Sequence, residues 1–160
     1  MLTHQFASIY NEQSKILILG TFPSVKSREQ NFYYGHPQNR FWRVLAGILE
    51  CEVPTDIDEK KRMLLQGKIA IWDVIASCDI QGSSDSSIRN VILNDINVIL
   101  QNSDVQAIYT NGKTAQKLFD KYLKPRSGRE SIALPSTSPA NAACSLERLT
   151  EEWSQIKQYL

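Results

Sequence analysis

The sequence predicts an α/β protein, a three-layer α/β/α sandwich around a short, mainly parallel four-stranded sheet. Four short apolar runs, at 15–20, 69–73, 105–110 and 131–134, have the length of strands and are bounded by turn residues. Segments with helical periodicity separate these runs, and such alternation is typical of parallel strands joined by right-handed crossovers. The length of 160 residues suits one domain, which we expect to extend over residues 1–160.

The first strand is expected at 15–20, because its apolar residues are continuous, as in a strand covered on both faces. Gly20 and Pro23 end the run, and a long loop rich in polar and aromatic residues follows. An apolar helical pattern then covers 41–49. In open α/β sheets ligands bind beyond the carboxyl ends of the strands, so this loop is the first candidate site.

The middle of the chain contains two further helical patterns. A helix is expected over 56–66, after a Thr/Asp capping region and before Gly67. The segment 78–87, CDIQGSSDSS, has the composition of an exposed loop that could also flank a site. The next helix is expected over 95–101, with Asn94 as its N-cap.

The last third repeats the design of the first loop. Helices are expected at 113–122, after the turn pair Asn111–Gly112, and at 146–159, which carries apolar residues at helical spacing. The stretch LPSTSPANA, residues 134–142, is the end of an apolar strand followed by a Ser/Thr/Pro/Asn turn. The two loops can therefore face each other across one cleft.

The composition excludes several classes of protein. Apolar content of 42% and charged content of 22% are ordinary for a globular domain, and a net charge of +1 argues mildly against a large DNA footprint. No apolar run has transmembrane length and the N-terminus lacks a signal-peptide pattern, so we expect no membrane association and a cytoplasmic location. The three scattered cysteines and two histidines lack metal-ligand spacing, so we expect no metal, with the cysteines as buried hydrophobes.

The loops contain amides, hydroxyls and aromatic rings but no familiar catalytic motif. There is no phosphate loop, no GxGxxG and no GxSxG, and His36 in Gly-His-Pro has no designated nucleophile. Such loops suit recognition of a flat hydrogen-bonding ring, stacked on Phe22, Phe32, Tyr33 or Tyr34. They also suit a reaction with a good leaving group and a cation-like transition state, such as hydrolysis of an N-glycosidic bond.

Five segments carry a family resemblance across essentially the whole chain. They are GTFPS at 20–24, YYGHPQNRFW at 33–42, WDV at 72–74, TNG at 110–112 and STSPAN at 136–141. Together they resemble the uracil-DNA glycosylase superfamily, and most of all its deoxyinosine (hypoxanthine)-DNA glycosylase branch. The resemblance implies a monomeric enzyme without cofactor or metal. It would flip a deaminated base, chiefly hypoxanthine, out of DNA and hydrolyse its N-glycosidic bond, leaving an abasic site.

Two positions depart from the uracil-excising branches of this superfamily. Phe22 occupies the place of a catalytic Asp or Asn, and the stretch 135–138 lacks the histidine that stabilises the departing base oxygen. We therefore expect poor excision of uracil. The resemblance to the deoxyinosine branch moves the catalytic amide to Asn39, which would align a water molecule against the sugar carbon.

The resemblance also assigns contacts to the base and to the DNA. Asp73 would accept a hydrogen bond from the ring N–H of hypoxanthine, which adenine lacks, and Asn111 would contact the base or water. The other residues expected at the base are Thr21, Phe22, Pro23, Tyr34, Gly35 and His36. Those expected at the DNA, where hydroxyls and backbone N–H groups would hold phosphates, are Ser24, Ser27, Ser138, Pro139, Ala140 and Asn141.

Simpler interpretations and other functions remain open at this point. Asn39 could cap the following helix, Asp73 and Asn111 could form turns, the aromatic residues could be core, and His36 could only fix its loop through a backbone hydrogen bond. The alternative functions are a broader glycosylase for uracil, xanthine or mismatched bases, a hydrolase of free nucleosides, and a non-catalytic binder of damaged bases.

Overall fold

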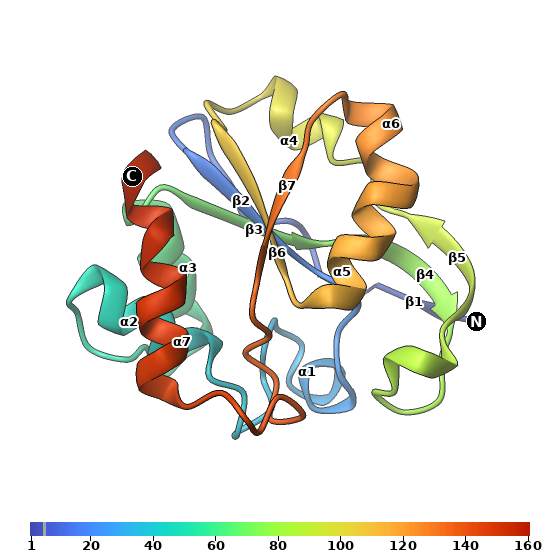
Figure 1. The fold of residues 1–160 in the computed structure, drawn as a ribbon, viewed down its shortest axis with the longest axis horizontal. Helices are drawn as coiled ribbons and strands as arrows, with labels where there is room; N and C mark the ends of the chain where they lie inside the picture. The colour runs from blue at the N-terminus through green and yellow to red at the C-terminus, as the bar shows by residue number, and fades with distance from the viewer. Residues whose placement is uncertain (5) are drawn as a thin grey trace.

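The computed structural model describes residues 1–4 and 6–160. Its centre is a four-stranded parallel sheet in the order β3-β2-β6-β7 (Figure 1). The strands are β2 (Ile16–Gly20), β3 (Ile69–Asp73), β6 (Ala107–Asn111) and β7 (Ser131–Leu134). The fold class expected from the sequence is confirmed. All four strands run in one direction, so their carboxyl ends share one edge of the sheet, with Gly20 opposite Asp73.

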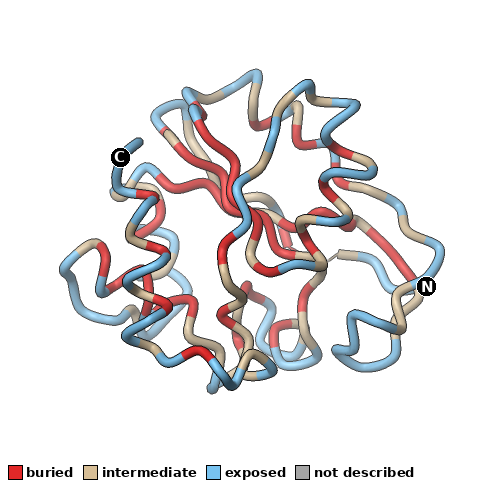
Figure 2. The backbone as a smooth tube through the Cα atoms, in the orientation of Figure 1, coloured by how far each residue is buried: buried red, intermediate tan, exposed pale blue. Residues whose placement is uncertain are grey.

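The side chains of β2 alternate between two hydrophobic cores. Ile16 and Ile18 belong to one core, and Leu17 and Leu19 belong to the other; all four are fully buried, as the red central strands of Figure 2 show. The first core contains residues of α2 (Phe41–Leu49), α3 (Ile57–Gln66) and α7 (Leu146–Trp153), and the second contains residues of α4 (Asn97–Gln101) and η2 (Phe119–Leu123). Burial on both faces is why the strand lacks polar alternation.

A second sheet, which the sequence analysis did not predict, lies beside the first. It is antiparallel, in the order β1-β4-β5, and consists of β1 (Leu2–Thr3), β4 (Ile75–Asp79) and β5 (Arg89–Leu93). The loop expected at 78–87 is therefore wrong at its start, since Cys78 and Asp79 end β4. Only Val74 separates β4 from β3. The two strands thus follow each other almost without a break, and no Gly or Pro in the sequence marks the point where the chain passes from one sheet to the other.

Asn94 fixes the junction between the two sheets. It is not the N-cap expected from the sequence, because its side-chain amide donates to the carbonyl oxygens of Asp73 at 2.8 Å and Ile75 at 3.2 Å. Helix α4 begins only at Asn97. The amide satisfies buried backbone groups where the chain leaves β3, and such satisfaction is required of a buried bend.

Several helices also differ in extent from those expected. Helix α1 (Val25–Gln30) lies within the segment expected to be a loop, with Ser24 as its N-cap. The helix expected at 113–122 is α5 (Lys113–Leu118) continued by the π-helical turn η2, followed by α6 (Lys124–Ser127). The helix expected at 146–159 is α7 continued by the 3₁₀ helix η3 (Ser154–Tyr159), and a 3₁₀ turn η1 covers Asp85–Ser87.

The cysteines only partly follow the expectation. Cys78 and Cys144 are buried, but Cys51 is exposed, so its assignment to the core is wrong. Within residues 1–4 and 6–160 no group of three or more His, Cys, Asp or Glu side chains is placed to hold a metal ion. In the same residues no helix is both long and apolar enough to cross a membrane.

Trp153 joins α7 to the turn that follows β7. Its side chain is fully buried, lies edge-on to Phe41 with ring centroids 5.9 Å apart, and donates through Nε1 to the Pro135 carbonyl at 2.9 Å. Trp153→Phe is therefore expected to lower the free energy of unfolding by about 1–3 kcal/mol, because the Pro135 carbonyl loses its partner and a fully buried side chain loses volume. Urea unfolding measures this, with Tyr159→Phe near the C-terminus as the control. A Trp153→Phe variant as stable as wild type would contradict the prediction.

Candidate active site

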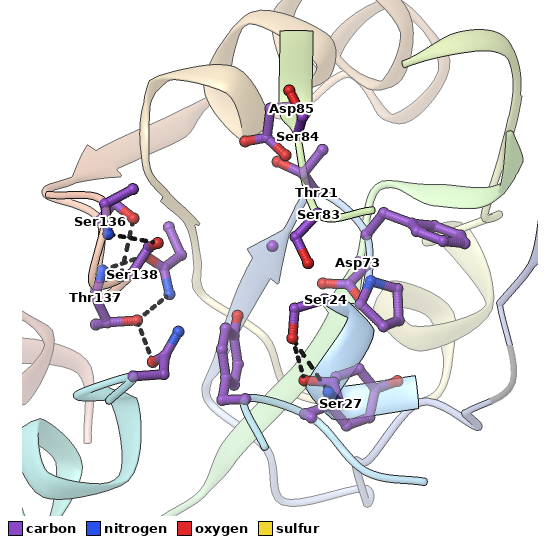
Figure 3. Close-up of a pocket in the computed structure, with 18 of the residues that line it drawn as sticks. Thr21, Ser24, Ser27, Asp73, Ser83, Ser84, Asp85, Ser136, Thr137 and Ser138 are labelled. Atoms are coloured by element: carbon purple, nitrogen blue, oxygen red, sulfur yellow. Dashed lines mark hydrogen bonds between the residues drawn. The ribbon is translucent and has the colours of Figure 1, made fainter. Parts of the chain in front are cut away.

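A cleft of about 440 Å³ opens at the carboxyl edge of the parallel sheet (Figure 3). Residues from the ends of β2, β3 and β6, from the loop before α2 and from the turn after β7 line it. Of the residues expected in the site, those that line the cleft are Thr21, Phe22, Pro23, Ser24, Ser27, Tyr34, Asn39, Asp73, Asn111, Ser138 and Ala140. Gly35, His36, Pro139 and Asn141 are not part of its lining.

The close approach of β2 and β3 places Asp73 in this cleft. Gly20 lies opposite Asp73 in the parallel register, and a β-carbon on Gly20 would be 2.4 Å from Asp73 Oδ1 and 2.9 Å from the Tyr34 hydroxyl oxygen. Real β-carbons do not approach other atoms so closely. Glycine is therefore the residue that allows a carboxylate and a phenol to share the end of β2.

The carboxylate of Asp73 is paired with His4, a partner that the sequence analysis missed. His4 Nε2 lies 2.8 Å from Asp73 Oδ2, and the two side chains are only 3% and 5% exposed. Pairing of β1 with β4 carries the N-terminus to this position. No sequence pattern links residues 69 positions apart, so the pair could not be anticipated.

The phenol of Tyr34 faces the same end of β2. Its backbone φ is +53°, and its ring stacks on Phe41 with centroids 3.9 Å apart. Its hydroxyl is buried and makes no hydrogen bond within the described residues. Burial first, and the negative charge of Asp73 second, raise the pKa of the Tyr34 hydroxyl far above its ordinary value, while the nearby Asn111 amide acts in the opposite direction. The group therefore remains protonated and is a free donor.

On the opposite wall, Asn39 and Asn111 are joined by Thr137 (Figure 3). The Thr137 hydroxyl donates to Asn39 Oδ1 at 2.9 Å and accepts from Asn111 Nδ2 at 3.0 Å. The Thr137 backbone N–H donates to Asn111 Oδ1 at 3.1 Å, and its side chain is fully buried. Thr137 was not predicted as a site residue, and it fixes the orientation of both amides.

This network determines which group Asn39 offers to a ligand. Its Oδ1 also accepts from the backbone N–H of Phe41 at 2.9 Å, as in the expected capping role, although the N-cap itself is Arg40. A backbone N–H can only donate, so the orientation of the amide is fixed. With its oxygen occupied twice, Asn39 is left with its NH₂ group, a hydrogen-bond donor.

Arg40 holds the turn after β7 in place. Its guanidinium donates to the carbonyl oxygens of Ser138 at 2.9 Å, Asn141 at 3.0 Å and Cys144, and its backbone N–H donates to Thr137 O at 3.0 Å. The loop 138–144 is thus tied to the residue that directly follows Asn39. One side chain fixes the distance between the two halves of this wall.

Two residues expected to contact a ligand also brace their own loop. Ser27 is 2% exposed, and its hydroxyl accepts from the Gly35 N–H at 2.9 Å, while its contact with a phosphate stays a prediction. His36 Nδ1 accepts from the Gln38 N–H at 3.0 Å, which is the simpler of its two interpretations. Both bonds shape the loop that presents Tyr34 and Asn39.

The serine-rich segment after β4 forms a third wall, for which the sequence contains only a weak signal. Ile80, Ser83, Ser84, Asp85 and Ser86 line the cleft (Figure 3). The Ser83 hydroxyl accepts from the Val25 N–H at 2.8 Å, and Arg28 donates to the Gly82 carbonyl at 2.7 Å. These bonds attach the segment to α1, so it is a wall of the cleft as well as a surface loop.

Comparisons with known proteins agree on one family. The model of the Uracil DNA glycosylase superfamily matches residues 7–159. A hypoxanthine DNA glycosylase of Methanosarcina acetivorans is 32% identical over 158 residues, covering 98% of both chains, and one of Methanosarcina barkeri is 29% identical over 152 residues, covering 94% of both. A solution NMR structure from M. acetivorans, provisionally described as a uracil DNA glycosylase, aligns with a TM-score of 0.82 and 31% identity over 98% of this chain and 96% of that one.

Substitution of Gly20 tests the packing of the cleft floor. Gly20→Ala is expected to cost about 1–3 kcal/mol of unfolding free energy, because its methyl group would meet Asp73 Oδ1, which His4 holds in place. In the double variant Gly20→Ala/Asp73→Ala the nearer obstruction is removed and only the Tyr34 hydroxyl at 2.9 Å remains, so a thermodynamic cycle should show a favourable coupling energy. Additive effects of the two substitutions would contradict this account.

Proposed function

The chain belongs to the uracil DNA glycosylase superfamily, and from this premise we propose that it is a monofunctional DNA glycosylase that excises hypoxanthine from deoxyinosine in DNA. Two relatives with the same name and near-complete coverage support the base preference. The observation that carries the proposal is the fixed Asn39 amide, which stands across the cleft from the buried carboxylate of Asp73. We propose further that the protein acts in the cytoplasm as a monomer without a cofactor.

The proposed reaction breaks the bond between N9 of the base and C1′ of the sugar. The bonding electron pair leaves with the base, the sugar becomes an oxocarbenium ion, and a water molecule adds to C1′ and releases a proton. The Asn39 NH₂ group can donate to one lone pair of this water while the other lone pair attacks. Asn39 then positions the water and does not deprotonate it, which suffices when the sugar is already a cation.

Asp73 supplies the reading of the base in this proposal. As a carboxylate it accepts the ring N–H of hypoxanthine, and adenine offers a lone pair at the same position. Phe22, beside the His4 ring at 6.0 Å between centroids, forms an apolar wall for the flipped base. Two segments are proposed to face the DNA. One is Ser24 at the N-terminus of α1, and the other is the turn that Arg40 holds, with Ser138, Pro139, Ala140 and Asn141.

Two substitutions of Asn39 distinguish the role of its amide oxygen from the role of its NH₂ group. Asn39→Ala removes both the oxygen and the NH₂ group, whereas Asn39→Asp keeps an acceptor for Phe41 N–H and Thr137 and replaces only the donor. Both variants are expected to lower the single-turnover rate on a duplex with one deoxyinosine by about 100-fold or more. Alkaline cleavage of labelled duplexes carrying inosine or uracil measures the rate, and fluorescence anisotropy checks that DNA binding persists.

Each outcome of this experiment has a definite meaning. If the wild type cleaves at neither base, the glycosylase proposal fails and a damaged-base binder or another hydrolase remains. If Asn39→Ala still cleaves inosine, the catalytic residue lies elsewhere, with Asp73 and Asn111 next to be tested. Release of hypoxanthine from the free nucleoside as well as from the duplex would favour a nucleoside hydrolase.

Thr137 is expected to act through Asn39 as a positioning residue. Thr137→Val keeps the shape of the side chain but removes the hydroxyl that orients both Asn39 and Asn111. We expect a fall of about 10- to 100-fold in kcat with little change in KM, and near-wild-type kcat in Thr137→Ser. Equal loss in the Val and Ser variants would show that packing, and not the hydroxyl, is what matters.

A further inference from the structure

We propose that His4 is a specificity-determining positioning residue, which holds Asp73 so that Oδ1 accepts from the ring N–H of the flipped base while the Tyr34 hydroxyl donates to the adjacent carbonyl oxygen. The inference rests on the proposed function and deepens it. It assigns to the cleft a reader for the lactam edge, the neighbouring N–H and C=O groups that hypoxanthine presents.

The contacts of His4 determine which of its two ring nitrogens carries the hydrogen. Its Nδ1 accepts from the Phe6 backbone N–H at 3.1 Å, so the proton of the neutral ring lies on Nε2. Nε2–H therefore donates to Asp73 Oδ2 at 2.8 Å. The ring is further enclosed by Phe6, Phe22 and Tyr33, with centroids 5.4, 6.0 and 5.7 Å away, so it has little freedom to turn.

Because Oδ2 is occupied, Oδ1 is the oxygen left for a ligand. Within the described residues no hydrogen bond reaches Oδ1, and Asp73 lines the cleft. Oδ1 and the Tyr34 hydroxyl both lie within 3 Å of the position that a β-carbon on Gly20 would take. An acceptor and a protonated donor thus stand side by side at the end of β2, and the donor is buried without a partner.

This pair matches one class of base edge and opposes another. A lactam offers N–H to the carboxylate and C=O to the phenol, so both protein groups are satisfied. Adenine and cytosine reverse the pattern, since each presents a ring nitrogen lone pair and an amino group, and both contacts then fail. Sites that hydrogen-bond a substrate group discriminate strongly, because the mismatched ligand leaves buried polar groups unpaired. Guanine shares the lactam edge and is protected by its pairing in the duplex.

The role of His4 makes a specific prediction for Asp73→Asn. Nε2–H would hold the amide oxygen and turn the NH₂ group toward the base, so a donor would replace the acceptor. In Asp73→Asn/His4→Phe nothing selects the oxygen side, and the amide can turn its carbonyl toward the base. The double variant should therefore read the lactam edge better than the single variant Asp73→Asn.

The test measures affinity for duplexes that carry a 2′-fluoroarabino analogue of deoxyinosine or deoxyadenosine, which resist cleavage. Wild type should prefer the inosine analogue by about 100-fold, Asp73→Asn should abolish the preference, and the double variant should recover about tenfold of it. His4→Phe should lower the preference by about tenfold and His4→Gln, which keeps an N–H donor, should restore it. Tyr34→Phe should weaken binding of the inosine analogue only.

Two outcomes would overturn the proposal. One is a His4→Phe variant that keeps the wild-type preference for the inosine analogue. The other is an Asp73→Asn/His4→Phe variant whose preference is no greater than that of Asp73→Asn. Circular dichroism identifies variants that fail to fold, and in that case the isosteric Asp73→Asn and Tyr34→Phe variants decide. Failure of the proposed function would give a different result: the wild type would bind the inosine analogue selectively but would not cleave deoxyinosine.

Discussion

The buried carboxylate of Asp73 is the constraint on which the rest of the cleft depends. Removing a carboxylate from water costs several kcal/mol unless hydrogen bonds replace the lost hydration. His4 provides one such bond, and it can do so only because β1 adds to β4 in a second sheet. Gly20 is required by the same group, since no side chain fits between the two strand ends. A single buried charge thus accounts for the placement of the N-terminal strand and for the glycine.

The opposite wall depends on a neutral hydroxyl in a comparable way. Thr137 donates to Asn39 and accepts from Asn111, so one fully buried side chain orients two amides. Asn111 stands between the walls, bonded to Thr137 and adjacent to the Tyr34 hydroxyl. Because these orientations are set by contacts within the protein, they are present before any ligand binds, and a preorganised site loses little entropy when it acts.

Local and periodic features could be predicted from the sequence, whereas contacts between distant segments could not. The four parallel strands follow from short apolar runs, and β3, α2 and β7 begin and end where expected. The second sheet was missed because Val74 alone divides β3 from β4, and helical propensity cannot show that Asn94 serves the backbone of β3. His4 and Thr137 were also missed in the sequence analysis, because their roles depend on distant partners. Their importance lies in partners 69 and 98 positions away, which no spacing rule connects.

In this arrangement the group that recognises the base also makes its departure as an anion harder. In the proposed reaction negative charge develops on the departing base, and a carboxylate beside that base opposes the charge. Two features offset this opposition: the Tyr34 hydroxyl, which its raised pKa keeps protonated, donates to the same base, and the carboxylate stabilises the oxocarbenium ion of the sugar by attraction. An amide at Asn39 adds no further negative charge, whereas a second carboxylate would. In the proposed reaction, an anion at the edge of the base and a neutral donor beside the sugar are therefore a consistent arrangement for an enzyme that must first distinguish its base.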